Sequence, residues 1–302
     1  MNEPIKYISK VEIKNLWGRY DFEWNLDPEV NILSGINGSG KSTVLGCIAY
    51  CMTSNYAFLD KLINLIDSIT IQFNNGKVIK LNKSNSFLIN FLDEQYSDSN
   101  FSKANFRIDR IDTFDKPLNQ NASPDEKVKT ELDKDLFILQ KRYLNYQLNI
   151  GKRVLEIVSK NGVDAHNEVL LIKKQQERLI EIIDSLFIYT NKKVDIESNE
   201  LNFLCGEDKL TPYQLSSGEK QILVILLKVL VQDNKPSILF MDEPEVSLHI
   251  DWQRKLIQYI RELNPNVQII LATHSPGIIL EGWRDKVFEM SDLITLDRKA
   301  KS

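Results

Sequence analysis

The sequence predicts an α/β fold in which a mixed sheet is flanked by helices and an antiparallel helical hairpin is inserted. A buried strand, a glycine-rich loop and a helix follow one another near the N-terminus, and apolar strands alternate with helices near the C-terminus. Between them, the chain has a long helical pattern with no internal proline. We therefore expect one head formed by residues 1–123 and 192–302, with residues 124–191 as the inserted hairpin.

The composition sets limits on the class of protein. The 302 residues are 42% hydrophobic and 26% charged, which is ordinary for a soluble globular protein. A net charge of −4 predicts no general attraction to nucleic acid or an anionic membrane, although a local basic patch stays open. No apolar run is long enough to span a bilayer, and the first residues do not resemble a signal peptide. The three cysteines include no C-x-x-C pair, so we expect a cytoplasmic protein without disulfides, zinc or a membrane partner.

The first part of the head contains several short strands. Five runs have strand character, and they cover residues 11–14, 20–26, 68–73, 77–81 and 106–114. The sequence Asn74-Asn75-Gly76 lies between two of these runs and is a strong hairpin signal. Residues 82–104 are mostly polar and irregular, and we expect a surface loop there.

The strongest chemical signal is the stretch at residues 35–43. It has the pattern G-x-x-x-x-G-K-S-T, follows the strand predicted for residues 30–34 and precedes a helix. Glycines let successive N–H groups turn towards an anion, and the helix N-terminus adds partial positive charge. We therefore expect a nucleoside triphosphate to be bound by Asn37, Gly38, Ser39, Gly40, Lys41, Ser42 and Thr43. In this arrangement Lys41 reaches the β- and γ-phosphates, and the Ser42 hydroxyl ligates Mg²⁺.

The insertion contains two apolar stripes with helical spacing. One runs from Leu132 to Ile157 and the other from Val169 to Leu186, with a stop signal at residues 159–162. They predict two antiparallel helices of about 30 residues, or about 45 Å, each. Two core-facing helices and a protruding arm both stay open as interpretations. The charges are evenly mixed, which is typical of a solvated surface and not of a DNA-binding stripe.

Acidic and histidine side chains follow the apolar strands of the C-terminal part. The strand predicted for residues 237–241 ends in Asp242 and Glu243, and the strand at residues 267–272 is followed by His274. A carboxylate at Asp242 can hold Mg²⁺ opposite the phosphate-binding loop. Glu243 is placed to orient or deprotonate a water molecule, and His274 to donate a hydrogen bond to a γ-phosphate.

A fourth motif precedes the helix predicted for residues 222–231. Ser216, Ser217 and Gly218 place hydroxyl and N–H groups at a helix start, which favours a second anion site. Taken alone, an ordinary serine N-cap is the other interpretation. A helix is also predicted for residues 250–263, between the last two strands.

In their order along the chain, these motifs resemble those of the ABC-type ATPase superfamily. Residues 35–43 are similar to its Walker A motif, 215–221 to its signature, 238–243 to its Walker B motif, and His274 to its switch histidine. The Ser-Ser-Gly-Glu-Lys signature and the Glu-Pro-Glu followed by Ser-Leu-His are similar to the SMC, SbcC, RecF and OLD group, not to transporters. The resemblance implies an ABC-ATPase-like P-loop fold that binds ATP and Mg²⁺, with Glu243 and His274 as catalytic residues.

The chain also departs from that group. Its hairpin is far shorter than an SMC or SbcC arm and has no cysteine hook, and about 28 residues follow His274, too few for the Toprim nuclease domain of OLD proteins. His249 takes the position of the D-loop aspartate, with Asp251 nearby. The Q-loop function has two candidates, which are Gln120 and residues 112–115.

The resemblance further implies an ATP sandwich. In it, Ser216–Gly218 of one subunit close over the nucleotide held by Lys41 of another, giving a homodimer or a larger homo-oligomer. Free-standing ATPases of this build resemble the ATPase subunits of bacterial anti-phage systems such as PARIS, Septu and retrons, whose partner is commonly a nuclease or toxin. An ATP-driven switch that controls such an effector protein is therefore the favoured function. The alternatives are a RecF-like DNA-binding repair clamp, which the net charge does not favour, and then a transporter subunit.

Overall fold

The computed structural model describes residues 3–53, 64–83, 90–91, 106–111, 116–118, 125–161 and 165–297. The chain divides into two compact units. The first unit comprises residues 1–113, 235–244 and 266–302, and the second comprises residues 114–234 and 245–265. Each unit is therefore assembled from segments that are far apart in the sequence.

The first unit contains a six-stranded antiparallel sheet. Its order is β14-β2-β1-β4-β5-β6, and its strands are β1 (Ile8–Leu16), β2 (Tyr20–Asn25), β4 (Ser68–Phe73), β5 (Val78–Asn82), β6 (Asn90–Phe91) and β14 (Ile294–Asp297). Along β1, buried Val11 and Ile13 alternate with the less buried Glu12, as expected for a sheet with one covered face. The hairpin predicted at Asn74-Asn75-Gly76 is confirmed by the pairing of β4 with β5. β6 lies within the segment predicted to be a loop.

A second, five-stranded sheet of the first unit is parallel throughout. Its order is β13-β3-β12-β11-β7, and its strands are β3 (Val30–Ser34), β7 (Arg107–Ile111), β11 (Ser237–Asp242), β12 (Val267–Ala272) and β13 (Val287–Glu289). Every residue of β12 is buried, as expected for a strand covered on both faces. The parallel and antiparallel strands thus form separate sheets, a division that the alternation pattern alone did not predict.

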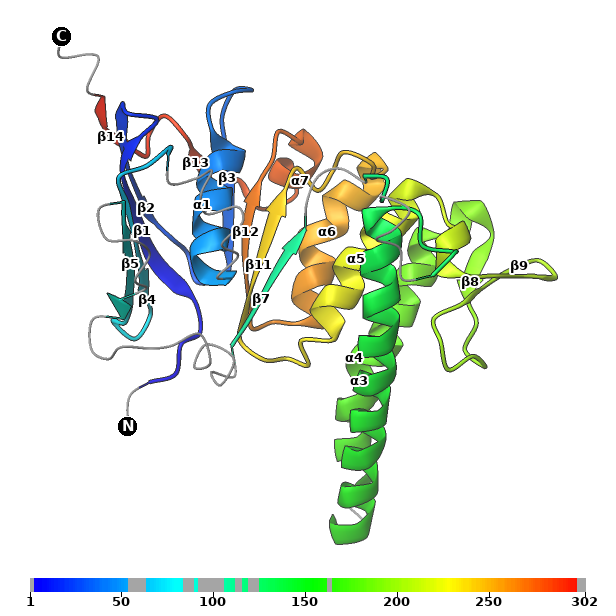
Figure 1. Ribbon diagram of the computed structural model, residues 1–302. Helices are drawn as coiled ribbons and strands as arrows, with labels where there is room; N and C mark the ends of the chain where they lie inside the picture. The colour runs from blue at the N-terminus through cyan, green and yellow to red at the C-terminus, as the bar shows by residue number, and fades with distance from the viewer. Residues whose placement is uncertain are drawn as a thin grey trace. The chain divides into compact units, whose positions relative to one another are not determined.

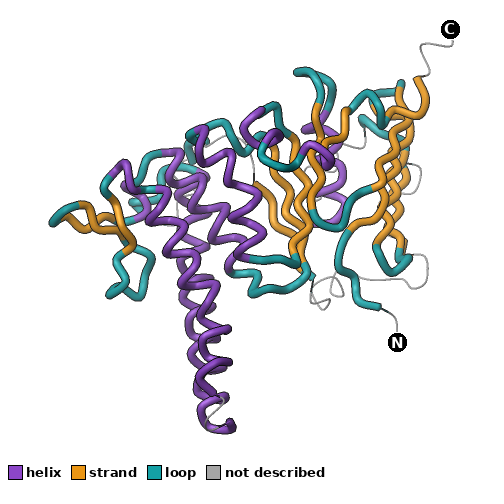
Figure 2. Tube along the Cα trace, turned by 180° about the vertical axis from the view of Figure 1, so that it is seen from behind, coloured by secondary structure: helices purple, strands orange, loops and turns teal. Residues whose placement is uncertain are grey.

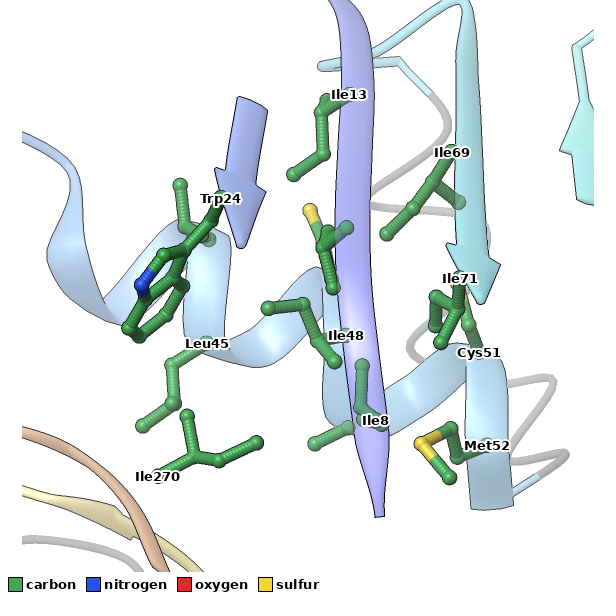
Figure 3. Packing of buried hydrophobic residues seen from close by; sticks show 14 of the residues in the cluster. Ile8, Ile13, Trp24, Leu45, Ile48, Cys51, Met52, Ile69, Ile71 and Ile270 are labelled. Atoms are coloured by element: carbon green, nitrogen blue, oxygen red, sulfur yellow. The ribbon is translucent and has the colours of Figure 1, made fainter. Parts of the chain in front are cut away.

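The main core of the first unit surrounds helix α1 (Lys41–Thr53), which lies between the two sheets (Figure 1). Figure 3 shows Leu45 and Ile48 of this helix among Ile13, Ile69 and Ile71 of the antiparallel sheet, with Ile270 of the parallel sheet nearby. Such packing fixes the helix that begins inside the phosphate-binding loop.

One polar side chain also fastens the two sheets together. Gln268 is buried in β12, where its Nε2 donates to the carbonyl of Ile8 at 2.8 Å. Its Oε1 accepts from the Ile8 N–H, also at 2.8 Å. Because the amide is satisfied on both sides, its burial carries little penalty.

The second unit is mainly helical. Its helices are α3 (Glu131–Asn161), α4 (Ala165–Leu186), α5 (Ser217–Leu230) and α6 (Ile250–Leu263), and a small sheet joins β10 (Asp208–Leu210), β9 (Phe203–Cys205) and β8 (Lys192–Val194). Helices α3 and α4 run side by side and extend beyond α5 and α6 (Figure 2). The predicted pair of helices is therefore confirmed, but α4 has 22 residues and is shorter than the predicted length of about 30, whereas α3 has 31. None of the helices in the described part of the chain combines the length and hydrophobicity that crossing a membrane requires.

The two halves of α3 resolve the choice between a core helix and an arm. Near its start, Leu136 and Leu139 are fully buried by the neighbouring helices. Near its end, the side chains of Leu155 and Val158 are 71% and 58% exposed. The hairpin is therefore part of the core at its base and an exposed arm at its far end.

Candidate functional site

The predicted phosphate-binding loop connects β3 to α1 in the first unit. Its three glycines, Gly35, Gly38 and Gly40, all have positive φ angles of 147°, 80° and 99°. L side chains rarely adopt this conformation, so the glycines are required by the backbone of the loop. Asn37 and Gly38 are exposed at the tip of the loop, and Thr43 is half-buried in the first turn of α1.

An aromatic ring that the sequence did not single out covers this loop. A Cβ atom on Gly40 would lie 1.7 Å from the indole of Trp17, which leaves no room for any other residue at this position. Trp17 belongs to the turn between β1 and β2 and has a positive φ of 53°. Its backbone N–H donates to the carbonyl of Leu65 at 2.6 Å. No spacing rule connects a turn tryptophan to a loop residue, so the sequence offered no signal for this contact.

The Lys41 side chain folds back against the phosphate-binding loop that precedes it in the sequence. This side chain is buried, and Nζ donates to the carbonyl oxygens of Gly35 at 3.0 Å and Ile36 at 3.4 Å. Nζ is also in contact with Nε2 of His274. Two side chains that were assigned to one site from separate motifs are therefore direct neighbours.

The proposed metal ligands also meet. The Ser42 hydroxyl, at the start of α1, donates to Oδ1 of Asp242 at 2.8 Å. Asp242 ends β11, so the helix start and the strand end face each other in the first unit. A hydroxyl and a carboxylate are hard oxygen ligands, which fit a Mg²⁺ ion that takes its other ligands from phosphate and water.

Glu243 has an unusual backbone conformation. Its φ angle is +43°, and its N–H donates to the carbonyl of Ala272 in β12 at 2.8 Å. Its carboxylate lies 3.8 Å from Nε2 of His274. A non-glycine residue held at positive φ stores strain, and such strain is concentrated at functional sites.

The position of His274 follows from its neighbours at the end of β12. The N–H of Ser275 donates to the Thr273 hydroxyl at 2.9 Å, and the Ser275 hydroxyl caps helix α7 (Pro276–Leu280) by accepting from the Ile278 N–H at 3.3 Å. The short segment between strand and helix is thereby fixed. It directs His274 towards Lys41 and Glu243.

One buried polar atom of the loop tests whether phosphate fits. The Ser39 hydroxyl oxygen is buried and has no hydrogen-bond partner among the described residues. A buried hydroxyl without a partner is costly in a folded protein. A phosphate oxygen at the loop would satisfy it, so the residues present fit the triphosphate that the motif predicts.

The predicted signature residues lie in the second unit, at the start of α5. Ser216 is the N-cap, and its hydroxyl accepts from the Glu219 N–H at 3.4 Å. Ser216 and Ser217 are exposed, whereas Gly218 is buried. A Cβ atom on Gly218 would lie 2.3 Å from the carbonyl oxygen of Ser247, so only glycine fits there without a shift of the backbone. Ser216 therefore caps α5, and Ser216 and Ser217 are also exposed, so the helix cap and the predicted anion site are both compatible with the structure.

The remaining predicted residues are less well connected. His249 is exposed and caps α6, where its Nδ1 accepts from the Asp251 N–H at 3.4 Å. Gln120 and residues 112–115, the two candidates for the Q-loop function, lie outside the described residues. The position of that function therefore stays a prediction.

Comparison with known proteins supports the ATPase interpretation. Residues 171–281 match a family model described as an AAA domain, putative AbiEii toxin, Type IV TA system. This segment contains the signature, the Walker B strand and His274. The chain is also 23% identical over 180 residues to the retron Vc95 probable ATPase of Vibrio cholerae serotype O1 biovar El Tor, covering 55% of this chain and 34% of that protein. It therefore matches only about a third of that relative.

Two longer matches cover nearly the whole chain. The Septu protein PtuA of Bacillus thuringiensis is 24% identical over 306 aligned residues, which cover 90% of this chain and 72% of that protein. Among solved structures, the SmcHead bound to the C-winged helix domain of ScpA matches with a TM-score of 0.58 at 15% identity, covering 91% of each chain. The predicted resemblance to the SMC-like group is confirmed, and the fold is similar to that of an SMC head.

Proposed function

We propose that this chain is an ATP-binding and ATP-hydrolysing switch subunit that dimerises through an ATP sandwich and controls a partner effector protein, in bacterial anti-phage defence. The observation that carries the proposal is the convergence of three motifs in the first unit. Lys41 contacts His274, His274 lies 3.8 Å from the Glu243 carboxylate, and Ser42 donates to Asp242. These residues come from three separate stretches of sequence, so chance proximity is a poor explanation.

Each residue has a role that follows from its position. Lys41 and the N–H groups of the loop bind the phosphates, and Ser42 and Asp242 hold Mg²⁺. The metal, when bound, neutralises charge on the phosphates. Glu243 lies at the end of a buried strand and accepts a proton from, or orients, the attacking water. His274 lies between Lys41 and Glu243, so it can donate a hydrogen bond on the γ-phosphate side and keep Glu243 in place.

The sandwich arrangement is supported by the exposed start of α5. Ser216 and Ser217 are exposed, and the N–H groups of this helix start point away from the helix. A second subunit can therefore approach with the phosphates of its own bound nucleotide. Closing such an interface stores binding free energy that hydrolysis releases, which is the property of a switch.

The effector and its biological setting are supported by the relatives. Two of them carry the names of a retron ATPase and a Septu protein, which belong to the systems that the motifs resemble. The exposed far end of the hairpin offers protein surface that the nucleotide chemistry does not use. We expect this surface to contact protein, either another copy of the chain or the effector.

Replacement of the proposed base tests the chemistry. Glu243→Gln should bind ATP as the parent does but hydrolyse it slower by a factor on the order of 10² or more, because the positioned base is lost. The control is Glu12→Gln, which makes the same chemical change on a partly exposed strand position of the first unit. ATP turnover and binding of a fluorescent ATP analogue are measured for all three proteins. Hydrolysis by Glu243→Gln at the parent rate would show that the base assignment is wrong.

A further inference from the structure

The first turn of the signature helix is held by a single buried carboxylate. The Glu219 side chain is only 2% exposed. Its Oε2 accepts from both the backbone N–H and the hydroxyl of Ser216, each at 2.9 Å. The only hydroxyl proton of Ser216 is therefore directed at Glu219, and the position of Ser216 depends on how this carboxylate is held.

The other oxygen of the Glu219 carboxylate accepts hydrogen bonds from two residues that are distant in the sequence. Oε1 accepts from the Thr190 hydroxyl at 2.9 Å and from the Lys192 ammonium at 2.8 Å. Thr190 lies in the segment between α4, which ends at Leu186, and β8, and Lys192 is the first residue of β8; we call this segment at residues 187–192 the base of the hairpin. One carboxylate thus receives four hydrogen bonds, two from the signature and two from the base of the hairpin.

The first helix of the hairpin reaches the same turn. Lys220, the neighbour of Glu219, donates to Asp133 at 2.7 Å, and these side chains are 13% and 4% exposed. Asp133 also accepts from the backbone N–H groups of Lys129 and Thr130, where α3 begins. The start of α3 and the segment after α4 therefore each send a charged group to the first turn of the signature helix.

Aromatic packing joins these parts on another side. The Phe187 ring, at the end of α4, lies 5.9 Å from Trp252 and 5.7 Å from Phe203, measured between ring centroids. The Trp252 ring comes within 3.9 Å of the place where a Gly218 Cβ would lie. The segment at residues 187–192 thus contacts Glu219 directly through its polar side chains, and its Phe187 ring reaches the Gly218 position only through Trp252.

We propose that Glu219 is a positioning residue that makes the signature segment respond to the base of the hairpin, through Thr190 and Lys192. This inference rests on the proposed function, in which Ser216–Gly218 close over the nucleotide of a second subunit. A displacement of Lys192 and Thr190 leaves Oε1 buried without donors, which is costly. The carboxylate then turns to find donors, and Ser216 loses both of the hydrogen bonds that it donates to it.

A consequence is that a protein bound to the hairpin regulates ATP-dependent assembly without touching the nucleotide. Displacement of the hairpin base changes the direction of the Ser217 and Gly218 N–H groups. The parts that bind ATP lie in the first unit and do not include any of these residues. Nucleotide affinity and assembly should therefore be separable by mutation.

The test uses residues outside the signature, in a Glu243→Gln background that accumulates the ATP-bound assembly. Lys192→Met removes the ammonium and keeps the length of the side chain up to Cε, and Lys192→Arg keeps the charge. The matched control is Lys228→Met on α5, the helix that carries Glu219. Lys228 also pairs with the hairpin, at 2.7 Å from Asp135 of α3, but it lies at the far end of α5 from the signature. Sedimentation measures ATP-dependent assembly, and a fluorescent ATP analogue measures nucleotide affinity.

We expect Lys192→Met to weaken ATP-dependent assembly by about tenfold or more, the effect of losing a charged hydrogen bond to a buried carboxylate. Thr190→Val should weaken it less, Lys192→Arg should restore most of it, and Lys228→Met should leave it unchanged. Nucleotide affinity should stay at the parent value in all four variants when it is measured at a protein concentration too low for assembly, since ATP binding and assembly are otherwise linked. If Lys192→Met assembled as well as Lys228→Met, or lost nucleotide affinity in parallel, the inference would be wrong.

One further variant separates this inference from the proposed function. Ser217→Arg places a large side chain on the signature surface and should block assembly completely. If Ser217→Arg blocks assembly while Lys192→Met does not weaken it, the sandwich stands and the positioning role of Glu219 is refuted. If Ser217→Arg assembles normally with ATP, the sandwich itself is refuted, and the positioning role with it.

Discussion

The two compact units hold their functional groups by different means. In the first unit, Asp242 ends β11, His274 follows the adjacent parallel strand β12, and Lys41 follows the loop after a third strand. Backbone pairing brings these residues together. In the second unit, the start of α5 is held mainly by two ion pairs, one from Asp133 at the start of α3 to Lys220 and one from Lys192 after α4 to Glu219. The first arrangement is fixed by the sheet, whereas the second depends on contacts that another protein can alter.

This difference matches the division of work in the proposed switch. Sheet register leaves little freedom, since Asp242 pairs with Ala272 and the Glu243 N–H donates to the same residue. Buried ion pairs are different because loss of one partner leaves an uncompensated charge and a large energetic response. In the proposed switch, the first unit would therefore carry the chemistry, and the second unit, whose signature is held by ion pairs, would carry the control.

The largest effect is expected where the first unit is most tightly packed. Gly40→Ala places a methyl group against the Trp17 ring and forces alanine to a φ of 99°. The backbone strain costs about 1–3 kcal/mol, and the overlap adds a cost of the same order. We expect thermal unfolding at lower temperature and loss of binding of a fluorescent ATP analogue.

A matched control separates strain from overlap. Gly76 has a similar φ of 79°, and no atom lies within 4 Å of the place where a new methyl group would be. Gly76→Ala should therefore be destabilised by the backbone strain alone and should keep ATP binding. Adding Trp17→Gly to Gly40→Ala should recover part of the lost stability. Equal destabilisation by Gly40→Ala and Gly76→Ala would contradict the proposed packing.

A smaller effect is expected at the signature glycine of the second unit. The methyl group of Gly218→Ala meets the Ser247 carbonyl, and relief of this contact should cost about 1–3 kcal/mol. ATP-dependent assembly should weaken while ATP binding is kept. Gly151→Ala, in α3 with open space around it, should instead stabilise the protein by about 0.5–1 kcal/mol. Calorimetry measures the stability change of each variant, and sedimentation measures the assembly of Gly218→Ala. Normal assembly of Gly218→Ala would argue against a signature whose backbone position is fixed.

The smallest effect concerns pH and the Glu219 carboxylate. Burial acts to raise the pKa of Glu219, but the Lys192 ammonium and the hydrogen bonds from Ser216 and Thr190 outweigh it, so the pKa lies below its ordinary value of 4.5. A depressed pKa stabilises the fold above the ordinary value, and this contribution is lost as pH falls through the folded-state pKa. Glu219→Gln should therefore be less stable than the parent at neutral pH, and the difference should narrow below about pH 4.5. A difference that stays constant on acid titration would contradict this account.

Local signals in the sequence were sufficient for much of the fold and of the first unit's site. The helix predicted for residues 250–263 and the strand for residues 267–272 have the observed bounds. Asp242, Glu243 and His274 were located because apolar strands end directly before them, and strand ends of a parallel sheet meet at one edge. Only neighbouring residues and strand direction are needed for such a prediction.

Contacts between distant segments were not accessible in this way. The Trp17 ring over Gly40 and the Ser247 carbonyl against Gly218 join segments with no shared periodicity. The charged contacts of Glu219 were missed for the same reason, since Thr190 and Lys192 lie 29 and 27 positions away in the sequence. The strands β13 and β14 were missed because runs of three or four residues give almost no pattern.

The most direct test of the account is the mass of the Glu243→Gln protein in sedimentation, with and without ATP and Mg²⁺. Because this variant should keep ATP and not turn it over, we expect a nucleotide-dependent shift to a dimer or a larger species. Ser217→Arg in the same protein should abolish the shift while leaving ATP binding unchanged. A Glu243→Gln protein that binds ATP and remains a monomer at all nucleotide concentrations would contradict the ATP sandwich.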